Sequence, residues 1–233
     1  MREVVLAERG TAGYRQYRIP ALVVLPSGRV LAAYDGRATV DDLPGPIDVV
    51  CRHSDDNGLT WSPQRVLRGG RGLEGFGDPS LLVDAETGRV FAFYAATRLA
   101  GFFESRVGAD DDPDVEQCGL SVSDDDGLTW QHRRLTPELK DLDIAAMFAA
   151  SGMGIQVAAG PYAGRLVQPY VVRRASGGIW ATMVFSDDHG QTWRHGELVG
   201  PGANENAVAC LRDGTLLLHS RATPHRLVAR STD

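Results

Sequence analysis

One eight-residue pattern, Ser-x-Asp-x-Gly-x-Thr-Trp, occurs three times in this chain and restricts the folds that it can adopt. The copies, here called Asp boxes, cover residues 54–61, 123–130 and 186–193, and residues 231–233 match the start of a fourth. Short Asp and Ser side chains bond backbone N–H groups in turns, Gly permits a φ above zero, and Trp has a large apolar ring to bury. Each box is therefore predicted to be a turn between two strands, anchored to the core by its tryptophan. This structural role is assigned to Ser54, Asp56, Gly58, Trp61, Ser123, Asp125, Gly127, Trp130, Ser186, Asp188, Gly190 and Trp193.

Each box is preceded by a pair of predicted strands joined by a Gly turn. The pairs lie within residues 20–34, 81–94, 154–170 and 208–219, and a third strand, such as 49–52 or 181–185, enters the box. A helical turn is expected only at residues 141–148. Units of four short antiparallel strands, repeated about every 50 to 70 residues, are typical of propeller blades. We expect a single all-β propeller domain over residues 1–233, incomplete at about four blades and interrupted within the fourth box.

Composition excludes several classes of function. The chain has 24 basic and 30 acidic residues, so its net charge of −6 argues against a nucleic-acid surface. No apolar run approaches the ~20 residues of a membrane span, and the N-terminus lacks the layout of a signal peptide. Its location therefore stays open. Cys51, Cys118 and Cys210 are too few and too far apart for a disulfide framework or a zinc site, and we expect them in the core.

The antiparallel order of the strands divides the polar residues between the two ends of each blade. The boxes lie at one end, and the residues before strand one, after strand two and in the loop between strands two and three lie at the other. Strands one and two line the axis of a propeller, so this second end should collect several arginines and carboxylates, as suits a carboxylate or phosphate ligand. The residues concerned are Arg18, Asp35, Arg37, Asp42, Asp78, Arg98, Glu205 and Arg221.

Several motifs, in this order, resemble bacterial exo-α-sialidases over nearly the whole chain. They are Arg18-Ile-Pro, Tyr34-Asp-Gly-Arg, Asp42-Leu-Pro-Gly-Pro, Phe76-Gly-Asp-Pro, Phe148-Ala-Ala-Ser-Gly, Asn204-Glu-Asn and Leu218-His-Ser-Arg, together with the boxes. The boxes alone also occur in propellers that are not enzymes. The resemblance implies a six-bladed β-propeller that removes terminal α-linked sialic acids from oligosaccharides, glycoproteins or glycolipids. It implies no cofactor and no metal.

The resemblance also implies roles for six residues. Arg18 and Arg221 match two of the three arginines that hold the sialic acid carboxylate, Arg37 matches a further arginine beside the ligand, and Asp78 matches a site carboxylate. Asp42 matches the general acid/base, and Glu205 matches the base that activates a tyrosine nucleophile. A near-neutral phenol avoids the repulsion that an anionic nucleophile would meet beside the substrate carboxylate.

Two parts of the family pattern have no match in the chain. The third arginine and the nucleophilic tyrosine belong to later blades, and the tyrosines at 14, 17, 34, 94, 162 and 170 all precede Glu205. We therefore expect these 233 residues alone to be inactive and poorly soluble, and a non-catalytic propeller that binds a sialylated glycan or a protein is the alternative function.

Individual residues also have alternative interpretations. Arg18 and Arg221 could pair with carboxylates between blades, and Glu205 could be a solvated turn residue. Asp41 could replace Asp42, or neither of the two could be functional. The acidic run Asp110, Asp111, Asp112, Asp114 and Glu116 lacks the spacing of a calcium loop and is expected to be solvated.

Overall fold

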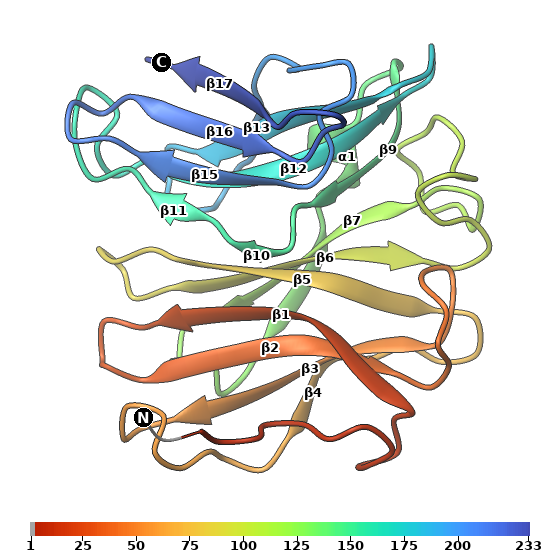
Figure 1. Ribbon diagram of the computed structural model, residues 1–233, viewed down its shortest axis with the longest axis vertical. Coiled ribbons are helices and arrows are strands. Elements are labelled where there is room, and N and C mark those ends of the chain that lie inside the picture. Colours follow the sequence, from red (N-terminus) through yellow and green to blue (C-terminus); the bar gives the residue numbers. More distant parts are fainter. Residues whose placement is uncertain (1–2) are drawn as a thin grey trace.

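Four β-sheets follow one another along the chain in the computed structural model, which describes residues 3–233 (Figure 1). Each sheet is one blade of a partial, all-β propeller, stacked from the N-terminal blade at the bottom of the view to the C-terminal blade at the top.

The first blade contains β1 (Gln16–Val24), β2 (Val30–Arg37), β3 (Ile47–Ser54) and β4 (Arg65–Arg68). The second contains β5 (Gly75–Val83), β6 (Val90–Thr97), β7 (Gln117–Ser123) and β8 (Gln131–Arg134). The third contains β9 (Ile144–Ala149), β11 (Ile155–Gln156), β12 (Leu166–Arg174), β13 (Ile179–Ser186) and β14 (Arg194–His195); the fourth contains β15 (Asn206–Cys210), β16 (Leu216–Ser220) and β17 (Leu227–Ser231). The predicted fold class is confirmed.

The expected helical turn at residues 141–148 is wrong. Residues 144–149 form β9, which pairs antiparallel with β12, and the single helical turn within residues 3–233 is α1 (Thr136–Leu139), with Pro137 in its first turn. The strand sequence Ile-Ala-Ala-Met-Phe-Ala is almost continuously buried. A short run that is apolar at every position has no period, so periodicity cannot distinguish a strand from a helix there.

The innermost strand of the third blade is interrupted. After β9 the chain forms β10 (Gly152–Met153), which pairs in parallel with β5 of the second blade, and it returns to its own blade as β11. Residues 154–157, predicted to be a full strand, therefore supply only a two-residue strand. The interruption joins the inner edges of the second and third blades by backbone hydrogen bonds.

The hydrophobic core lies between the blades. Leu31 and Val49 from the first blade pack with Leu81 and Val90 from the second in one cluster of buried side chains. A second cluster joins the second blade to the third, as in the packing of Phe93 against Tyr170. Burial of each such side chain contributes roughly 1.5–3 kcal/mol, so adjacent blades stabilise one another. As expected, Cys51 and Cys118 are buried, whereas Cys210 is partly exposed.

The three boxes form one repeated turn. In the second box the Ser123 hydroxyl donates to Asp125 Oδ1 (2.7 Å) and accepts the N–H of Gly127 (2.9 Å). Hydrogen bonds from the Thr129 hydroxyl and backbone N–H then lower the pKa of Asp125 to about 2. The predicted positive φ of the glycine is confirmed, at 76° for Gly127. The preceding residue also has a positive φ, at 58° for Asp126, which the pattern did not predict.

An arginine at the start of strand two connects each of the first two blades to the box of the next. Arg29 pairs with Asp55 in the box of its own blade, and its Nη1 donates to the carbonyl of Asp126 in the second box (3.1 Å). Arg89 repeats this arrangement with Asp124 and with the carbonyl of His189 in the third box (3.2 Å). These arginines therefore hold the blades together. Within residues 3–233, no helix is both long and apolar enough to cross a membrane.

Candidate active site

The inner strands β1 and β5 have matching bulges at the end opposite the boxes. The pairing of β1 shifts between Arg18 and Ala21, and that of β5 shifts between Gly77 and Ser80. In each bulge a residue before a proline has a positive φ, 55° at Ile19 and 58° at Asp78. A β-branched residue rarely adopts this conformation, and such strained backbone often accompanies functional sites. Arg18 and Asp78 were predicted to precede their strands but lie within them, at these bulges.

Arg37 is the centre of the first group of charges. It is at the end of β2, and its side chain is only 2% exposed. Its Nε and Nη2 both donate to Asp35 Oδ2, at 3.0 and 2.7 Å, and its Nη1 donates to Asp42 Oδ1. Arg18 Nη1 also donates to Asp42 Oδ1 (3.2 Å). A buried carboxylate therefore holds Arg37, while Arg37 and Arg18 together orient the exposed carboxylate of Asp42.

Asp78 connects this group to the fourth blade. Its backbone N–H donates to Asp35 Oδ1 (3.0 Å). Burial is the largest influence on the pKa of Asp78 and raises it. The positive charges of Arg37 and Arg18 lower this pKa, and the negative charges of Asp42 and Glu205 raise it further. Groups influence one another in this way only when they are close together. Charges from the first and fourth blades thus both act on Asp78, at the end of the inner strands opposite the boxes.

Glu205 and Arg221 flank β15 and β16 at the same end. Arg221 Nη1 donates to Glu205 Oε2 (2.6 Å), and two backbone hydrogen bonds also join the segments: Arg221 N–H to Glu205 O (2.7 Å) and Asn204 N–H to Arg221 O (2.9 Å). Both side chains are more than half exposed. All six residues predicted at the site thus lie at the same end of their blades, in two ion-paired groups and with Asp78 in the bulge of β5.

The geometry bears on two of the alternatives. Arg37 Nη1 donates a hydrogen bond to the side chain of Asp42, whereas Asp41 accepts one only through its backbone carbonyl (3.1 Å). This difference favours Asp42 as the site carboxylate. The acidic partners of Arg18 and Arg221 are Asp42 and Glu205, each from the same blade as its arginine. The pairing between blades that was considered for these arginines is not found among residues 3–233.

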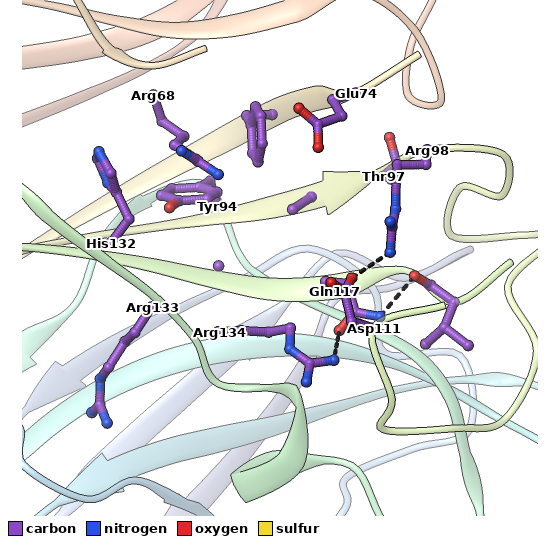
Figure 2. Close-up of a pocket in the computed structure, with 14 residues that line it drawn as sticks. Arg68, Glu74, Tyr94, Thr97, Arg98, Asp111, Gln117, His132, Arg133 and Arg134 are labelled. Atoms are coloured by element: carbon purple, nitrogen blue, oxygen red, sulfur yellow. Dashed lines mark hydrogen bonds and ion pairs between the residues drawn. The ribbon is translucent and has the colours of Figure 1, made fainter. Parts of the chain in front are cut away.

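Arg98 was expected at the same end but does not join the cluster. It pairs with Asp111 at one side of a cavity of about 300 Å³ between the first and second blades, where Arg68, Tyr94 and Arg134 also lie (Figure 2). The loop before β7 carries Asp111 to Arg98, and the sequence contains no signal for this contact.

Two buried carboxyl groups, Asp35 and Glu116, were not assigned roles from sequence. Burial and the negative charge of Asp78 raise the pKa of Asp35, while the charge and hydrogen bonds of Arg37 lower it. Glu116, expected in a solvated loop, is 2% exposed, and burial raises its pKa to about 8 despite the nearby Lys140; Asp78 adds to the rise. Glu116 directly precedes β7, so its burial follows from the strand rather than from the acidic run.

None of the tyrosines joins the charged cluster through a hydrogen bond recorded for residues 3–233. Tyr94 and Tyr170 are buried in the packing between blades, and burial raises the pKa of both phenols. Tyr14 donates to Asp48 (2.7 Å), Tyr34 to Gln64 (3.1 Å) and Tyr17 to the carbonyl of residue 11 (2.9 Å). Tyr162 lies under the guanidinium of Arg165.

Comparisons with known proteins agree with the fold and the motif order. The profile of the BNR repeat-like domain matches residues 28–233. A sialidase of Micromonospora viridifaciens is 48% identical over 98% of this chain, and one of Bacteroides fragilis is 32% identical over 88%. The structure of the Hadza microbial sialidase Hz136 superposes with a TM-score of 0.89 over 96% of this chain, at 31% identity.

The chain spans only part of these proteins: 36% of the Micromonospora sialidase, 39% of the Bacteroides sialidase and 46% of Hz136. The matched parts nevertheless include nearly all of this chain, with its boxes and its charged cluster. The chain belongs to the BNR repeat-like domain family, and the resemblance to bacterial sialidases indicated by its motifs is confirmed.

Proposed function

We propose that this chain forms the carboxylate-binding and acid–base part of an exo-α-sialidase, which hydrolyses terminal α-linked sialic acids. The observation that carries the proposal is that two ion-paired groups, Arg18 and Arg37 with Asp42 and Arg221 with Glu205, lie with Asp78 at one end of the inner strands. Relatives named sialidases support the substrate class. The substrates would be sialylated oligosaccharides, glycoproteins or glycolipids.

The exposed side of the cluster suits an anionic sugar. Arg18 and Arg221 are 46% and 66% exposed, so their forked guanidiniums can receive a carboxylate, while Arg37 stays buried as a fixed positive charge. Asp42 is 73% exposed and can reach a leaving-group oxygen, to which it would donate a proton as general acid.

In the family's chemistry the nucleophile is a tyrosine activated by a carboxylate. Glu205 is in a position to take the proton of such a phenol, since it lies at the rim of the cluster. No tyrosine hydroxyl within residues 3–233 bonds to it. We propose that the nucleophile and the third arginine come from outside this segment, so the chain by itself binds sialic acid without turnover.

A second function is favoured by the positions of the tyrosines. Because Tyr94 and Tyr170 are buried and the other phenols have partners elsewhere, the cluster can hold a sialylated glycan without any covalent step. In this alternative the chain is a binding module.

A chimera separates the two functions. The matching segment of the Micromonospora sialidase is replaced by this chain, and release of the fluorophore from a fluorogenic sialoside is measured. The sialidase proposal expects turnover that is abolished by Glu205→Gln. A folded chimera that binds free sialic acid without turnover would favour the binding module, and absence of binding would contradict both.

Binding is measured on the 233-residue chain by calorimetric titration with sialic acid. Arg18→Ala should weaken binding roughly ten- to hundredfold, the value of one charge-assisted hydrogen-bonded contact. Arg212→Ala, which removes an exposed arginine in the turn between β15 and β16, at the end of the blade that carries the boxes, is the control and should leave the affinity unchanged.

A further inference from the structure

The loop that carries Asp42 lies against the second blade. Residues 38–46 connect β2 to β3 in the first blade and are here called the Asp42 loop. Among residues 3–233, no hydrogen bond joins this loop to the second blade. The two are instead in direct contact at two glycines, Gly75 at the start of β5 and Gly101 in the loop that follows β6.

Both glycines leave room for the Asp42 loop because they have no side chain. A Cβ added to Gly101 would lie 2.7 Å from the carbonyl oxygen of Leu43 and 2.8 Å from Cδ of Pro44. One added to Gly75 would overlap the carbonyl oxygen of Gly45 and would lie 2.7 Å from Cδ2 of Leu43. The φ of neither glycine lies in the left-handed region, so both positions require space rather than an unusual backbone conformation.

Gly101 belongs to a turn, residues 101–105, that is fixed to the third blade. The carbonyl of Gly101 accepts the N–H of Ser105 (2.9 Å), and the buried Ser105 hydroxyl donates to the carbonyl of Ala145 in β9 (2.8 Å). Arg173 of β12 donates from Nε to the carbonyl of Phe102 (2.7 Å) and from Nη2 to that of Ser105. The Asp42 loop of the first blade therefore rests on a turn of the second blade that the third blade holds in place.

The position of Asp42 depends on where its loop rests. Among the described residues, the Asp42 carboxylate bonds only Arg37 and Arg18, both in the first blade, and its side chain is 73% exposed. Leu43, which directly follows Asp42 in the chain, contacts both glycines of the second blade. A displacement of the Leu43 backbone is therefore passed on to Asp42, and a misplacement of ~1 Å can reduce a rate by about 100-fold.

We propose that Gly101 is a positioning residue for the general acid of the reaction. Its bare Cα lets the Asp42 loop rest on the turn at residues 101–105, and this contact keeps the Asp42 carboxyl within reach of the leaving-group oxygen. Gly101 takes no part in the chemistry itself and acts through Asp42. This role of Gly101 rests on the proposed function, in which Asp42 donates a proton to the leaving group.

The test compares two leaving groups in the chimera with the Micromonospora sialidase, which keeps all of these contacts within the inserted chain. The phenol of a fluorogenic aryl sialoside departs with little protonation, whereas the sugar alcohol of 3′-sialyllactose needs the general acid. Gly101→Ala should lower kcat/KM for sialyllactose by roughly tenfold or more and that for the aryl sialoside by less than about threefold, since general acid catalysis contributes about 10²–10⁴-fold. A defect in folding alone would lower both values equally, and such an equal loss would overturn the proposal.

Two further variants control for the added methyl group. Gly196→Ala in the third blade places a Cβ 3.6 Å from its nearest neighbour, the carbonyl oxygen of Met183, and should leave both substrates unaffected. Leu43→Ala removes the side chain that lies over Gly75, so it loosens the contact without a collision. It should produce the same selective loss on sialyllactose, and it keeps the test available if Gly101→Ala does not fold. A folded Leu43→Ala chimera without this selectivity would contradict the proposal.

The Asp42→Ala background separates this proposal from the proposed function. If Gly101 acts through Asp42, adding Gly101→Ala to Asp42→Ala should cause no further loss on either substrate. If Asp42→Ala is selective for sialyllactose but Gly101→Ala is not, the role of Gly101 is wrong and the proposed function stands. If Asp42→Ala itself shows no selectivity, Asp42 is not the general acid and both proposals are wrong.

Discussion

Asp35 accepts two hydrogen bonds from Arg37 and one from the backbone N–H of Asp78, and it is fully buried. The Asp35 carboxyl group thus holds the side chain of Arg37 in the first blade and the backbone of Asp78 in the second. At the residue scale, the exposed groups that would meet a substrate depend on buried groups that would not. Asp42 depends on Arg37, which in turn depends on Asp35.

Asp35→Asn should therefore lower both stability and affinity for sialic acid. Asparagine is neutral and leaves the buried Arg37 without its full partner, so we expect a loss of about 2–3 kcal/mol in the free energy of unfolding, measured with urea. Asp55→Asn, which alters the exposed pair with Arg29, is the control and should leave the unfolding midpoint within error. Equal effects of the two substitutions would show that burial of the Arg37 pair is unimportant.

Glu116 predicts a dependence on pH. Its pKa is raised from 4.5 to about 8 by burial, so the folded state binds the proton more tightly than the unfolded state does. The corresponding stability is present below about pH 4.5 and is lost as the pH rises through 8. Glu116→Gln should be close in stability to the parent chain at pH 5 and more stable than it at pH 9 by roughly 4 kcal/mol, since a pKa raised from 4.5 to about 8 corresponds to ~1.36 kcal/mol for each pH unit. The free energy of unfolding is measured with urea at both pH values. Destabilisation at pH 9 would mean that ionised Glu116 is stabilised by Lys140.

At the scale of the element, the Asp box is both a turn and a connection between blades. Within each box, one Asp and one Ser satisfy the backbone of the turn. Between blades, Arg29 and Arg89 bond backbone carbonyls of the next box, and the box tryptophan fills the contact. The repeated pattern therefore encodes how neighbouring blades associate, in addition to the turn itself.

Asp188→Ala should destabilise the chain by about 1–2 kcal/mol, the typical loss for a side chain that caps backbone N–H groups. Asp188 accepts hydrogen bonds from the N–H and hydroxyl of Thr192 and from Ser186. Gln191→Ala in the same box is the control, because this side chain is exposed, and it should leave the melting temperature nearly unchanged. Comparable losses from both substitutions would contradict the assigned role of the box Asp.

At the scale of the molecule, the last sheet is distinct because, among the strands of residues 3–233, β17 pairs with β16 alone. Its other edge presents unpaired backbone groups, and Val228 on this strand is 60% exposed. Edges of this kind promote association with other chains. The expectation of poor solubility for the 233-residue chain agrees with this exposed edge.

Val228→Lys should reduce concentration-dependent association of the chain, measured by static light scattering, because a charged side chain on an edge strand opposes pairing with another strand. Val5→Lys introduces the same charge at an exposed valine outside any strand and should have little effect. If both reduce association equally, net charge rather than the β17 edge is responsible.

Much of the fold and of the candidate site could be predicted from the sequence. The boxes have a local cause, since their Asp, Ser and Gly residues act on the backbone of the same turn. The strand pairs are visible as short apolar runs joined by a Gly turn. Their antiparallel order alone places Arg18, Asp78, Glu205 and Arg221 at the end of the blades opposite the boxes. These predictions need no knowledge of which segment packs on which.

The remaining features depended on contacts between distant segments. The burial of Glu116, the pairing of Arg98 with Asp111, and the strand at residues 144–149 each depend on what covers a residue from another part of the chain. The sequence by itself determined the repeated turns, the blades and the end at which the charges gather. Only the tertiary structure decided which charges pair and which are buried, because the free energy of an ionisable group depends on its surroundings, and those are assembled from several blades.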